Sequence, residues 1–426
     1  MSATSALSRD ECRKIVQKQL QRDDFELMSF TMSPLSSQMK GLMGDHLKLR
    51  VSVLVGDKEN RDTESTELQF FLKAVPVGDD YRRKFAASGV TYQKEVLFYS
   101  ELQRDVQKHL RCSDYESSTY FGTVPQCYYL RPDLLVLEDL VLAGFRVLDS
   151  KEPLDLEHCK CVLKALARFH AASLVYEERE GRRLADAHPL LLEESFYRKE
   201  RGFSHYEAQA ESRRVTHVLL DLIPHFAPGT AHNEELHRFV NPVMEDVYEL
   251  LKPSDKYRNV LCHRDLWLNN MLFAEDAKGE LSVRFVDFQT LHLEPPAHDV
   301  LLFLHLNTTR ELRQTHGRKL LELYHQSLAD VLRQHDLNVD SVLPLHIFLQ
   351  SCDDSKPVAI IITIYILQAL LLPLQQDADL ESFLLDRTTL TKAAYERDER
   401  YRSRMTEAME ELVETCLLPR LREHHR

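Results

Sequence analysis

Residues 47–55, LKLRVSVLV, alternate between apolar and polar side chains, so that the apolar residues share one face. A period of two over this length predicts a half-buried strand. The polar run at 56–66 then predicts a hairpin loop, and LQFFLKAVPV at 68–77 predicts the returning strand. Two shorter apolar stretches, at 124–130 and 134–140, predict a second pair of strands. This part of the chain is therefore expected to form an antiparallel sheet.

Helical spacing marks two further segments of the same part, residues 11–30 and 84–107. In the second segment Tyr92, Val96 and Tyr99 recur near the spacing of a helix and define an apolar face. The expected order around this helix is strand, strand, helix, strand, strand.

From about residue 153 the pattern changes to long helices. The run at 159–178 is amphipathic throughout, residues 204–252 predict two more helices, and helical patterns return after residue 297. A strand-like island at 257–290 interrupts them.

These patterns predict an α+β fold with two lobes. The N-terminal lobe, residues 1–140, would carry the antiparallel sheet, and the C-terminal lobe, residues 141–426, would be mainly helical. The expected boundary is a hinge near 138–142.

Composition supports a helix-rich globular chain. Only 12 of 426 residues are glycine, 43% are hydrophobic and 28% are charged, which excludes collagen-like, mucin-like and disordered chains. The formal net charge is −13, and no block of Lys and Arg stands out. We therefore expect neither nucleic acid nor an anionic membrane surface as a partner.

The compartment is expected to be the cytoplasm. The N-terminal residues contain no long apolar stretch typical of a signal peptide, and the eight cysteines are scattered without a CxxC pair. The uncharged run at 358–374 is at the short limit for a membrane span and is interrupted by Thr363, Tyr365 and Gln368. It therefore predicts a buried core helix.

The island at 257–290 holds the residues with the clearest chemical meaning. It reads VLCHRDLWLNNMLF and then VRFVDFQ, so an apolar strand leads to Asp265, Asn270 follows five residues later, and a second apolar strand leads to Asp287. We expect these three side chains at the ends of adjacent short strands. Phosphoryl transfer needs such a set, because one carboxylate orients the attacking hydroxyl and accepts its proton, while Asn and Asp oxygens hold Mg²⁺.

The N-terminal lobe offers a complementary pair. Lys73 lies within an apolar strand, and Glu95 lies on the apolar face of the predicted helix. A buried charge needs a partner, and pairing Lys73 with Glu95 satisfies both side chains.

The stretch VLCHRDLWLNNMLF, with VRFVDFQ and AHD after it, resembles the ecdysteroid-kinase-like family. That family is part of the superfamily of aminoglycoside phosphotransferases and choline kinases, which have a protein-kinase-like fold. LVLEDL (135–140), LARFHAAS (166–173), FLKAVP (71–76) and YQKEVLFY (92–99) extend the resemblance over roughly residues 40–305.

The resemblance implies ATP-dependent phosphorylation of a small-molecule hydroxyl, with Asp265, Asn270 and His263 in the catalytic loop and Mg²⁺ on Asn270 and Asp287. His263 is expected to brace this loop rather than to act as a base. The resemblance also assigns the nucleotide to residues of the N-terminal lobe and the hinge, which are Gly41, Gly44, Lys73, Glu95, Glu138, Asp139 and Leu140.

The chain departs from the family pattern at Arg264, where many relatives have glycine. A protein kinase is disfavoured, because Gln289 follows Asp287-Phe288 and only eleven residues separate Asp287 from Asp299. Asp299 is expected to cap the next helix and to bond the backbone of the catalytic loop. The segment HLEPPAH (292–298) has two prolines and irregular spacing, which argues against a zinc site.

Three functional alternatives remain open. The resemblance implies an ecdysteroid or another apolar metabolite or xenobiotic as the acceptor. The apolar residues around Trp267, which are Leu266, Leu268 and Met271, favour an apolar acceptor over a cationic one. A choline- or ethanolamine-type kinase is the second possibility. A pseudokinase that only binds a ligand is the third. It is disfavoured because the chain has all five candidate kinase residues, which are Lys73, Glu95, Asp265, Asn270 and Asp287. The oligomeric state is not predicted.

Overall fold

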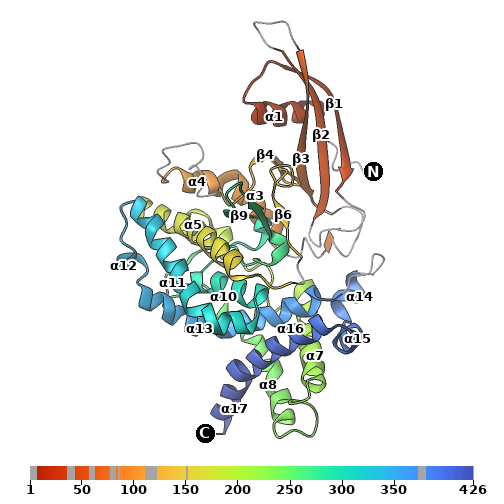
Figure 1. The fold of residues 1–426 in the computed structure, drawn as a ribbon, viewed down its shortest axis with the longest axis vertical. Helices are drawn as coiled ribbons and strands as arrows, with labels where there is room; N and C mark the ends of the chain where they lie inside the picture. The colour runs from red at the N-terminus through yellow and green to blue at the C-terminus, as the bar shows by residue number, and fades with distance from the viewer. Residues whose placement is uncertain are drawn as a thin grey trace.

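The computed structural model describes residues 7–35, 44–56, 63–76, 83–84, 87, 89–110, 122–149, 152–372 and 380–425. A sheet with its helices forms one end of an elongated molecule, and a larger helical body forms the other (Figure 1). The predicted two-lobed α+β architecture is confirmed, and we call the two parts the small lobe and the large lobe.

The small lobe is built on a five-stranded antiparallel sheet with the strand order β1-β2-β3-β5-β4. Its strands are β1 (Phe25–Pro34), β2 (Asp45–Gly56), β3 (Thr63–Ala74), β4 (Cys127–Arg131) and β5 (Leu134–Glu138). Helix α1 (Arg9–Leu20) covers one face, where its Ile15 and Val16 are buried in one cluster with Leu49 and Val51 of β2. The alternation at 47–55 thus predicted the buried face of β2 correctly.

The segment predicted as a helix over residues 11–30 is only partly helical. Helix α1 ends at Leu20, and residues from Phe25 onwards form β1. A β-bulge shifts the register of β1 between Leu27 and Ser29. The bulge displaces the apolar positions by one residue, so Phe25, Leu27, Phe30 and Met32 follow no simple period of two.

The other face of the sheet meets the large lobe through a helical segment. It consists of α3 (Thr91–Leu97), a π-helical turn (Phe98–Leu102) and α4 (Gln103–Gln107). Residues 83, 84 and 87 are helical, as predicted for 84–107, but Gly89 and Val90 form a bend that interrupts the helix before α3 begins at Thr91. The ring of Phe98 stacks on Phe288 of the large lobe, with centroids 4.0 Å apart. This contact places α3 directly beside the residue that follows Asp287.

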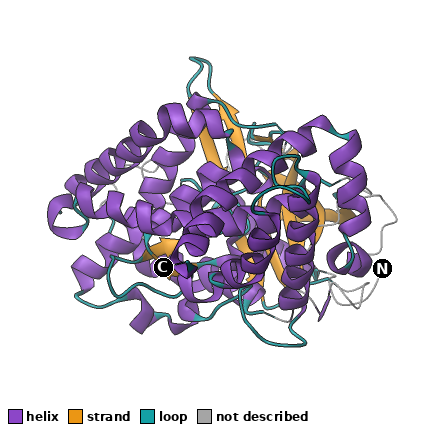
Figure 2. Cartoon of the chain, turned by 90° about the horizontal axis from the view of Figure 1, so that it is seen from below, coloured by secondary structure: helices purple, strands orange, loops and turns teal. Residues whose placement is uncertain are grey.

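Helices dominate the large lobe, with two small sheets near the junction of the lobes (Figure 2). The helices are α5 (Leu156–Glu180), α6 (Leu184–Ala187), α7 (Ser204–Leu222), α8 (Asn233–Glu245), α9 (Val247–Leu250), α10 (Pro296–Asn307), α11 (Arg310–Gln334), α12 (Val339–Val342), α13 (Leu345–Leu370), α14 (Leu380–Leu385), α15 (Thr388–Arg397), α16 (Glu399–Leu412) and α17 (Leu418–His424). One sheet has the order β6 (Arg146–Val147), β8 (Met271–Glu275), β9 (Leu281–Phe285), and β7 (Val260–Cys262) pairs with β10 (His292–Glu294).

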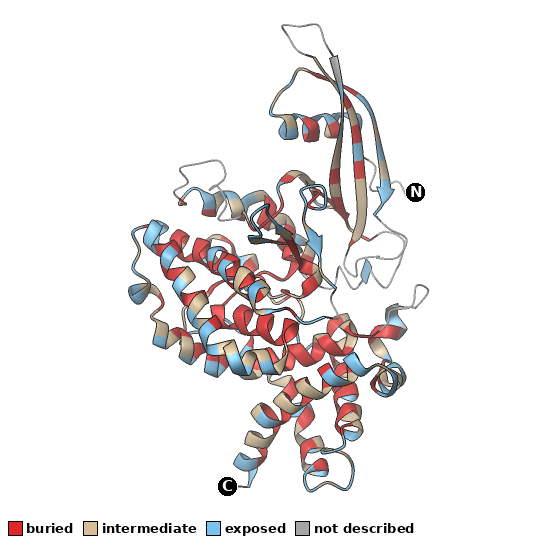
Figure 3. Cartoon of the chain, viewed as in Figure 1, coloured by how far each residue is buried: buried red, intermediate tan, exposed pale blue. Residues whose placement is uncertain are grey.

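The described part of the apolar run, residues 358–372, lies inside the large lobe as predicted, although its helix starts earlier. Helix α13 begins at Leu345, so Lys356 and Pro357 lie within it rather than before it. Its apolar residues are buried against α10 and α16 (Figure 3). Among the described residues, none of the helices combines the length and the apolar character that a membrane span needs.

Candidate active site

The loop between β7 and β8, residues 263–270, forms the centre of the site, and we call it the catalytic loop. Asn270 donates from Nδ2 to both the backbone oxygen (2.9 Å) and Oδ2 (2.7 Å) of Asp265. Asn270 is buried, and Asp265 is partly exposed. These two bonds fix the Asp265 carboxylate within the loop.

Two buried side chains hold the start of this loop. The carboxylate of Asp299 accepts the backbone N–H groups of His263 (2.6 Å) and Arg264 (2.7 Å). The predicted contact of Asp299 with the loop backbone is therefore present. The predicted helix cap is wrong, because α10 begins at Pro296 and Asp299 lies in its first turn. His170 of α5 contacts Asp299 at 3.1 Å and fixes the carboxylate from the other side.

Asp287 is brought next to Asn270 by backbone contacts. The N–H of Val286 donates to the backbone oxygen of Asn270 (3.0 Å), and the His263 ring contacts the Val286 oxygen at 3.0 Å. Asp287 itself has φ +69°, a left-handed conformation that turns the chain sharply after β9. The expectation that all three polar side chains end adjacent strands is wrong, because β7 pairs with β10 and not with β8.

Lys73 of β3 joins the two lobes at this point. Its Nζ lies 2.6 Å from Oε2 of Glu95 and 2.8 Å from Oδ1 of Asp287. The predicted ion pair with Glu95 is confirmed, and the second contact, with Asp287, was not predicted. Lys73 and Glu95 belong to the small lobe and Asp287 to the large lobe, so only the contact with Asp287 joins the two lobes.

The protonation states at this site follow from burial and charge. Burial alone raises the pKa of Asp287, but the charge of Lys73 outweighs it, so the pKa lies below its usual value and Asp287 is ionised. Burial, and then the negative charge of Asp287, raise the pKa of Asp265 to about 7. A carboxylate with this pKa is well suited to accept a proton near neutral pH.

Replacement of Lys73 by methionine should destabilise the protein strongly. The variant leaves Glu95, whose side chain is 1% exposed, and Asp287 without their shared cation. Removing one partner of a buried ion pair costs about 3–5 kcal/mol, and urea denaturation would measure that loss. Lys160→Met is the matched control, because Lys160 pairs with Glu157 on the surface and its loss should cost less than about 1 kcal/mol. If Lys73→Met lost as little free energy of unfolding as Lys160→Met, the buried ion pairs of Lys73 would contribute little to stability.

The residues expected to meet ATP are only partly placed. Gly41 lies outside the described residues. Gly44 lies against Lys73, because a Cβ on Gly44 would come within 3.3 Å of the Lys73 side chain. This close approach suits a residue that covers the phosphates beside Lys73.

The hinge residues Glu138, Asp139 and Leu140 lie at the end of β5, where the chain leaves the sheet. The carboxylate of Asp139 accepts the N–H of Val141 (3.1 Å) and the side-chain amide of Gln69 (2.6 Å). Since Asp139 is committed to this turn, we expect the backbone of the segment, rather than its carboxylates, to meet the nucleotide.

The donor set fits Mg²⁺. The Nδ2 atom of Asn270 makes both of its hydrogen bonds to Asp265. The Oδ1 atom of Asn270, which can ligate a cation, accepts no hydrogen bond from the described residues. Asp287 adds a carboxylate of which one oxygen contacts Lys73. Hard divalent cations prefer such oxygen ligands.

Sequence reasoning missed how Arg264 is held. Its guanidinium contacts Glu194 and Glu294, which lie 70 and 30 residues away along the chain. Glu294 was noted only as part of a disfavoured zinc site, and Glu194 carries no sequence signal. Lys94, beside Glu95 on the same buried helix, could have been noticed as a second buried charge.

The apolar residues around Trp267 belong to the hydrophobic core. Leu266 and Met271 are fully buried, Leu268 is 3% exposed, and all three belong to the hydrophobic core. Their apolar character is therefore explained by core packing and gives no information about the acceptor. Trp267 is partly exposed and packs against a different cluster, formed mainly by helices of the large lobe.

Comparison with known proteins places this geometry in a family. The model of the ecdysteroid kinase-like family matches residues 43–337. No curated protein matches the chain.

Solved structures resemble the chain only weakly. An ethanolamine kinase from Plasmodium vivax is 13% identical, with a TM-score of 0.40, over 95% of this chain and 94% of its own. A microcompartment-associated aminopropanol kinase is 15% identical, with a TM-score of 0.39, over 95% and 98%. A choline/ethanolamine kinase family protein from Mesorhizobium loti is 14% identical, with a TM-score of 0.33, over 89% and 93%. Likeness at this level says nothing about the ligands of this chain.

Proposed function

The chain belongs to the ecdysteroid kinase-like family, and from this premise we propose that it transfers the γ-phosphate of ATP to a hydroxyl group of a small molecule. The observation that carries the proposal is the convergence of Lys73, Glu95 and Asp287 beside the bonded pair of Asp265 and Asn270. Binding alone would not require a carboxylate fixed at the centre of the site with a pKa near 7.

Each residue has a defined task in the proposed reaction. Asp265 orients the acceptor hydroxyl and accepts its proton as the oxygen attacks the γ-phosphorus and the bond to the bridging oxygen of ADP breaks. Lys73, held by Glu95, offers its charge to the phosphates. Asn270 and Asp287 would hold Mg²⁺, which when bound neutralises charge on the phosphate oxygens.

We propose that the acceptor is an uncharged, largely apolar alcohol such as an ecdysteroid or another apolar metabolite or xenobiotic. Cationic amino alcohols are usually held on aromatic faces. Two tyrosine rings of the large lobe already have an arginine of the chain beside them. Arg264 lies 5.8 Å from the ring centre of Tyr197, and Arg213 lies 5.4 Å from that of Tyr206. A second cation at these rings would be repelled.

A competition assay tests the acceptor class. An ecdysteroid panel and a choline and ethanolamine panel are offered at equal concentration with ATP and Mg²⁺, and phosphorylated products are detected by mass. We expect phosphate on the ecdysteroid panel. Preferential phosphorylation of choline or ethanolamine would replace the acceptor class and leave the kinase assignment standing, whereas ATP binding without transfer to any member of a broad metabolite panel would favour the pseudokinase alternative.

A further inference from the structure

Four charged side chains lie together behind the catalytic loop, and we call them the bracing cluster. They are Lys94 of α3, Glu194 of the segment before α7, Arg264 of the catalytic loop and Glu294 of β10. Lys94 and Glu294 are fully buried, and the Arg264 side chain is 6% exposed. The cluster therefore contains one lysine, one arginine and two glutamates from both lobes, and Glu194, whose side chain is 19% exposed, is its most exposed member.

Arg264 is the centre of the cluster. Its Nη1 lies 2.9 Å from Oε2 of Glu194, and its Nε lies 3.2 Å from Oε1 of Glu294. Its backbone has φ +67°, a left-handed conformation that glycine adopts without cost and arginine does not. The conformation explains why glycine suits this position in relatives, and the two ion pairs offset its cost here.

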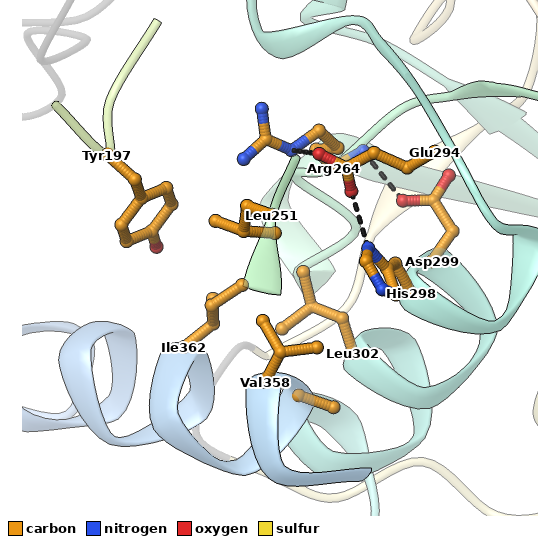
Figure 4. Close-up of a pocket in the computed structure, with 10 residues that line it drawn as sticks. Tyr197, Leu251, Arg264, Glu294, His298, Asp299, Leu302, Val358 and Ile362 are labelled. Atoms are coloured by element: carbon orange, nitrogen blue, oxygen red, sulfur yellow. Dashed lines mark hydrogen bonds and ion pairs between the residues drawn. The ribbon is translucent and has the colours of Figure 1, made fainter. Parts of the chain in front are cut away.

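The two carboxylates are themselves fixed. The other oxygen of Glu194 accepts the backbone N–H groups of Phe196 (2.8 Å) and Tyr197 (3.0 Å). Glu294 contacts the ring of His298 at 2.8 Å. Figure 4 shows Arg264, Glu294 and His298 joined in this way, with Tyr197 facing Arg264 across a small cavity whose opposite wall is apolar. Arg264 is thus held between two immobile partners.

Lys94 connects the same cluster to the small lobe. Its Nζ donates to the backbone oxygens of Glu193 (2.5 Å) and Leu291 (2.6 Å). Glu193 precedes Glu194, and Leu291 begins the segment that leads to Glu294. Helix α3, which carries Glu95, is therefore bonded to the two chain segments that hold Arg264.

A metal ion is the alternative occupant of this place. Ligand atoms of Glu194, His292 and Glu294 lie within 4.8 Å of one another. The guanidinium of Arg264 already contacts both carboxylates, so the positive charge that a metal would supply is present.

We propose that Arg264 is a positioning residue for Asp265, and that the bracing cluster fixes the catalytic loop relative to α3. Asp265 is bonded to Arg264 through the main chain, and the Arg264 side chain is the only group of the described loop that links it to both Glu194 and Glu294. The effect of this positioning on kcat rests on the proposed function, whereas its effect on the conformation of the catalytic loop does not.

The single tryptophan of the chain, Trp267, reports on this loop directly. In Arg264→Gly the backbone conformation is tolerated and both ion pairs are lost. We expect the Trp267 emission to shift to longer wavelength and its quenching by acrylamide to increase.

The same variant is expected to lose turnover. With the acceptor identified by the competition assay, kcat should fall about 100-fold, the size of effect that follows a misplacement of about 1 Å, while KM for ATP changes less than about three-fold. Arg264→Lys, which keeps the charge, should recover part of the wild-type Trp267 fluorescence and part of kcat.

Arg387→Lys is the matched control. Arg387 is as deeply buried, but it bonds to Ser212 and to the Leu384 oxygen at the contact of α7 with α14. The Arg387→Lys variant should have a lower free energy of unfolding, with the Trp267 fluorescence and kcat unchanged. If Arg264→Gly does not fold, as judged by circular dichroism, Glu194→Gln serves in its place, with smaller changes of the same sign.

Unchanged Trp267 signals in a folded variant would overturn the proposal, and so would changed signals with an unchanged kcat. Failure of the proposed function is distinct, because the wild type itself would then transfer no phosphate while the Trp267 measurement still reports on the loop.

Discussion

Asp265→Asn is expected to reduce kcat by about 10²–10⁴-fold, because general-base catalysis typically accelerates a reaction by a factor of this size. The ATP affinity should stay within a few-fold of wild type. The substituted side chain keeps an oxygen that can accept the bond from Asn270 Nδ2, now 2.7 Å from the Asp265 carboxylate. The loop geometry is therefore retained, and the loss should be specific to accepting the proton. Single-turnover transfer and equilibrium ATP binding, measured separately, check both parts.

Asp276→Asn is a suitable control for this experiment. Asp276 lies in the exposed turn between β8 and β9, where it accepts backbone N–H groups of Lys278 and Glu280. The same chemical change there should leave kcat unchanged. Turnover of Asp265→Asn within a few-fold of wild type would remove Asp265 from the role of base.

Asp287→Ala is expected to abolish the gain in ATP affinity that Mg²⁺ produces. Loss of a group that merely orients a metal ligand costs about 10–100-fold in metal affinity, so loss of a ligand should cost at least as much. The measurement is ATP binding with and without Mg²⁺, by calorimetry. Alanine also removes a contact of Lys73 and takes a left-handed conformation at φ +69°, so some loss of stability is expected as well.

Asp287→Asn separates these effects. Asparagine tolerates the left-handed conformation and can still accept a bond from Lys73, but it lacks the charge. We expect this variant to be more stable than Asp287→Ala and still to lose most of the Mg²⁺ effect. A normal response of ATP affinity to Mg²⁺ in both variants would assign the metal to other residues.

The sequence by itself determined the elements and the order of the chemical groups. The alternation at 47–55 gave the buried face of β2, because side chains along a strand alternate between its two faces whatever lies around it. The apolar surroundings of Lys73 and Glu95 predicted their ion pair, because a buried charge without a partner is too costly to persist. The motif from His263 to Asn270, followed by Asp287, indicated the chemistry through the types and spacing of its residues.

Local irregularities limited the prediction elsewhere. The bulge in β1 shifted its apolar positions out of register, and the strand was read as part of a helix. The uncharged run at 358–374 predicts a helix of its own, yet α13 begins at Leu345 and continues through Pro357. In both cases the packing of the finished lobe, rather than the preference of the segment, decided its structure.

Only the tertiary structure decided which residues meet at the site. The contact of Lys73 with Asp287 joins residues 214 positions apart, and Arg264 finds Glu194 and Glu294 in segments whose sequences show no relation to the catalytic loop. The same packing placed Leu266 and Met271 in the hydrophobic core. Periodicity and propensity act over a few residues, whereas these pairings depend on how distant segments fold against each other, which no local pattern encodes.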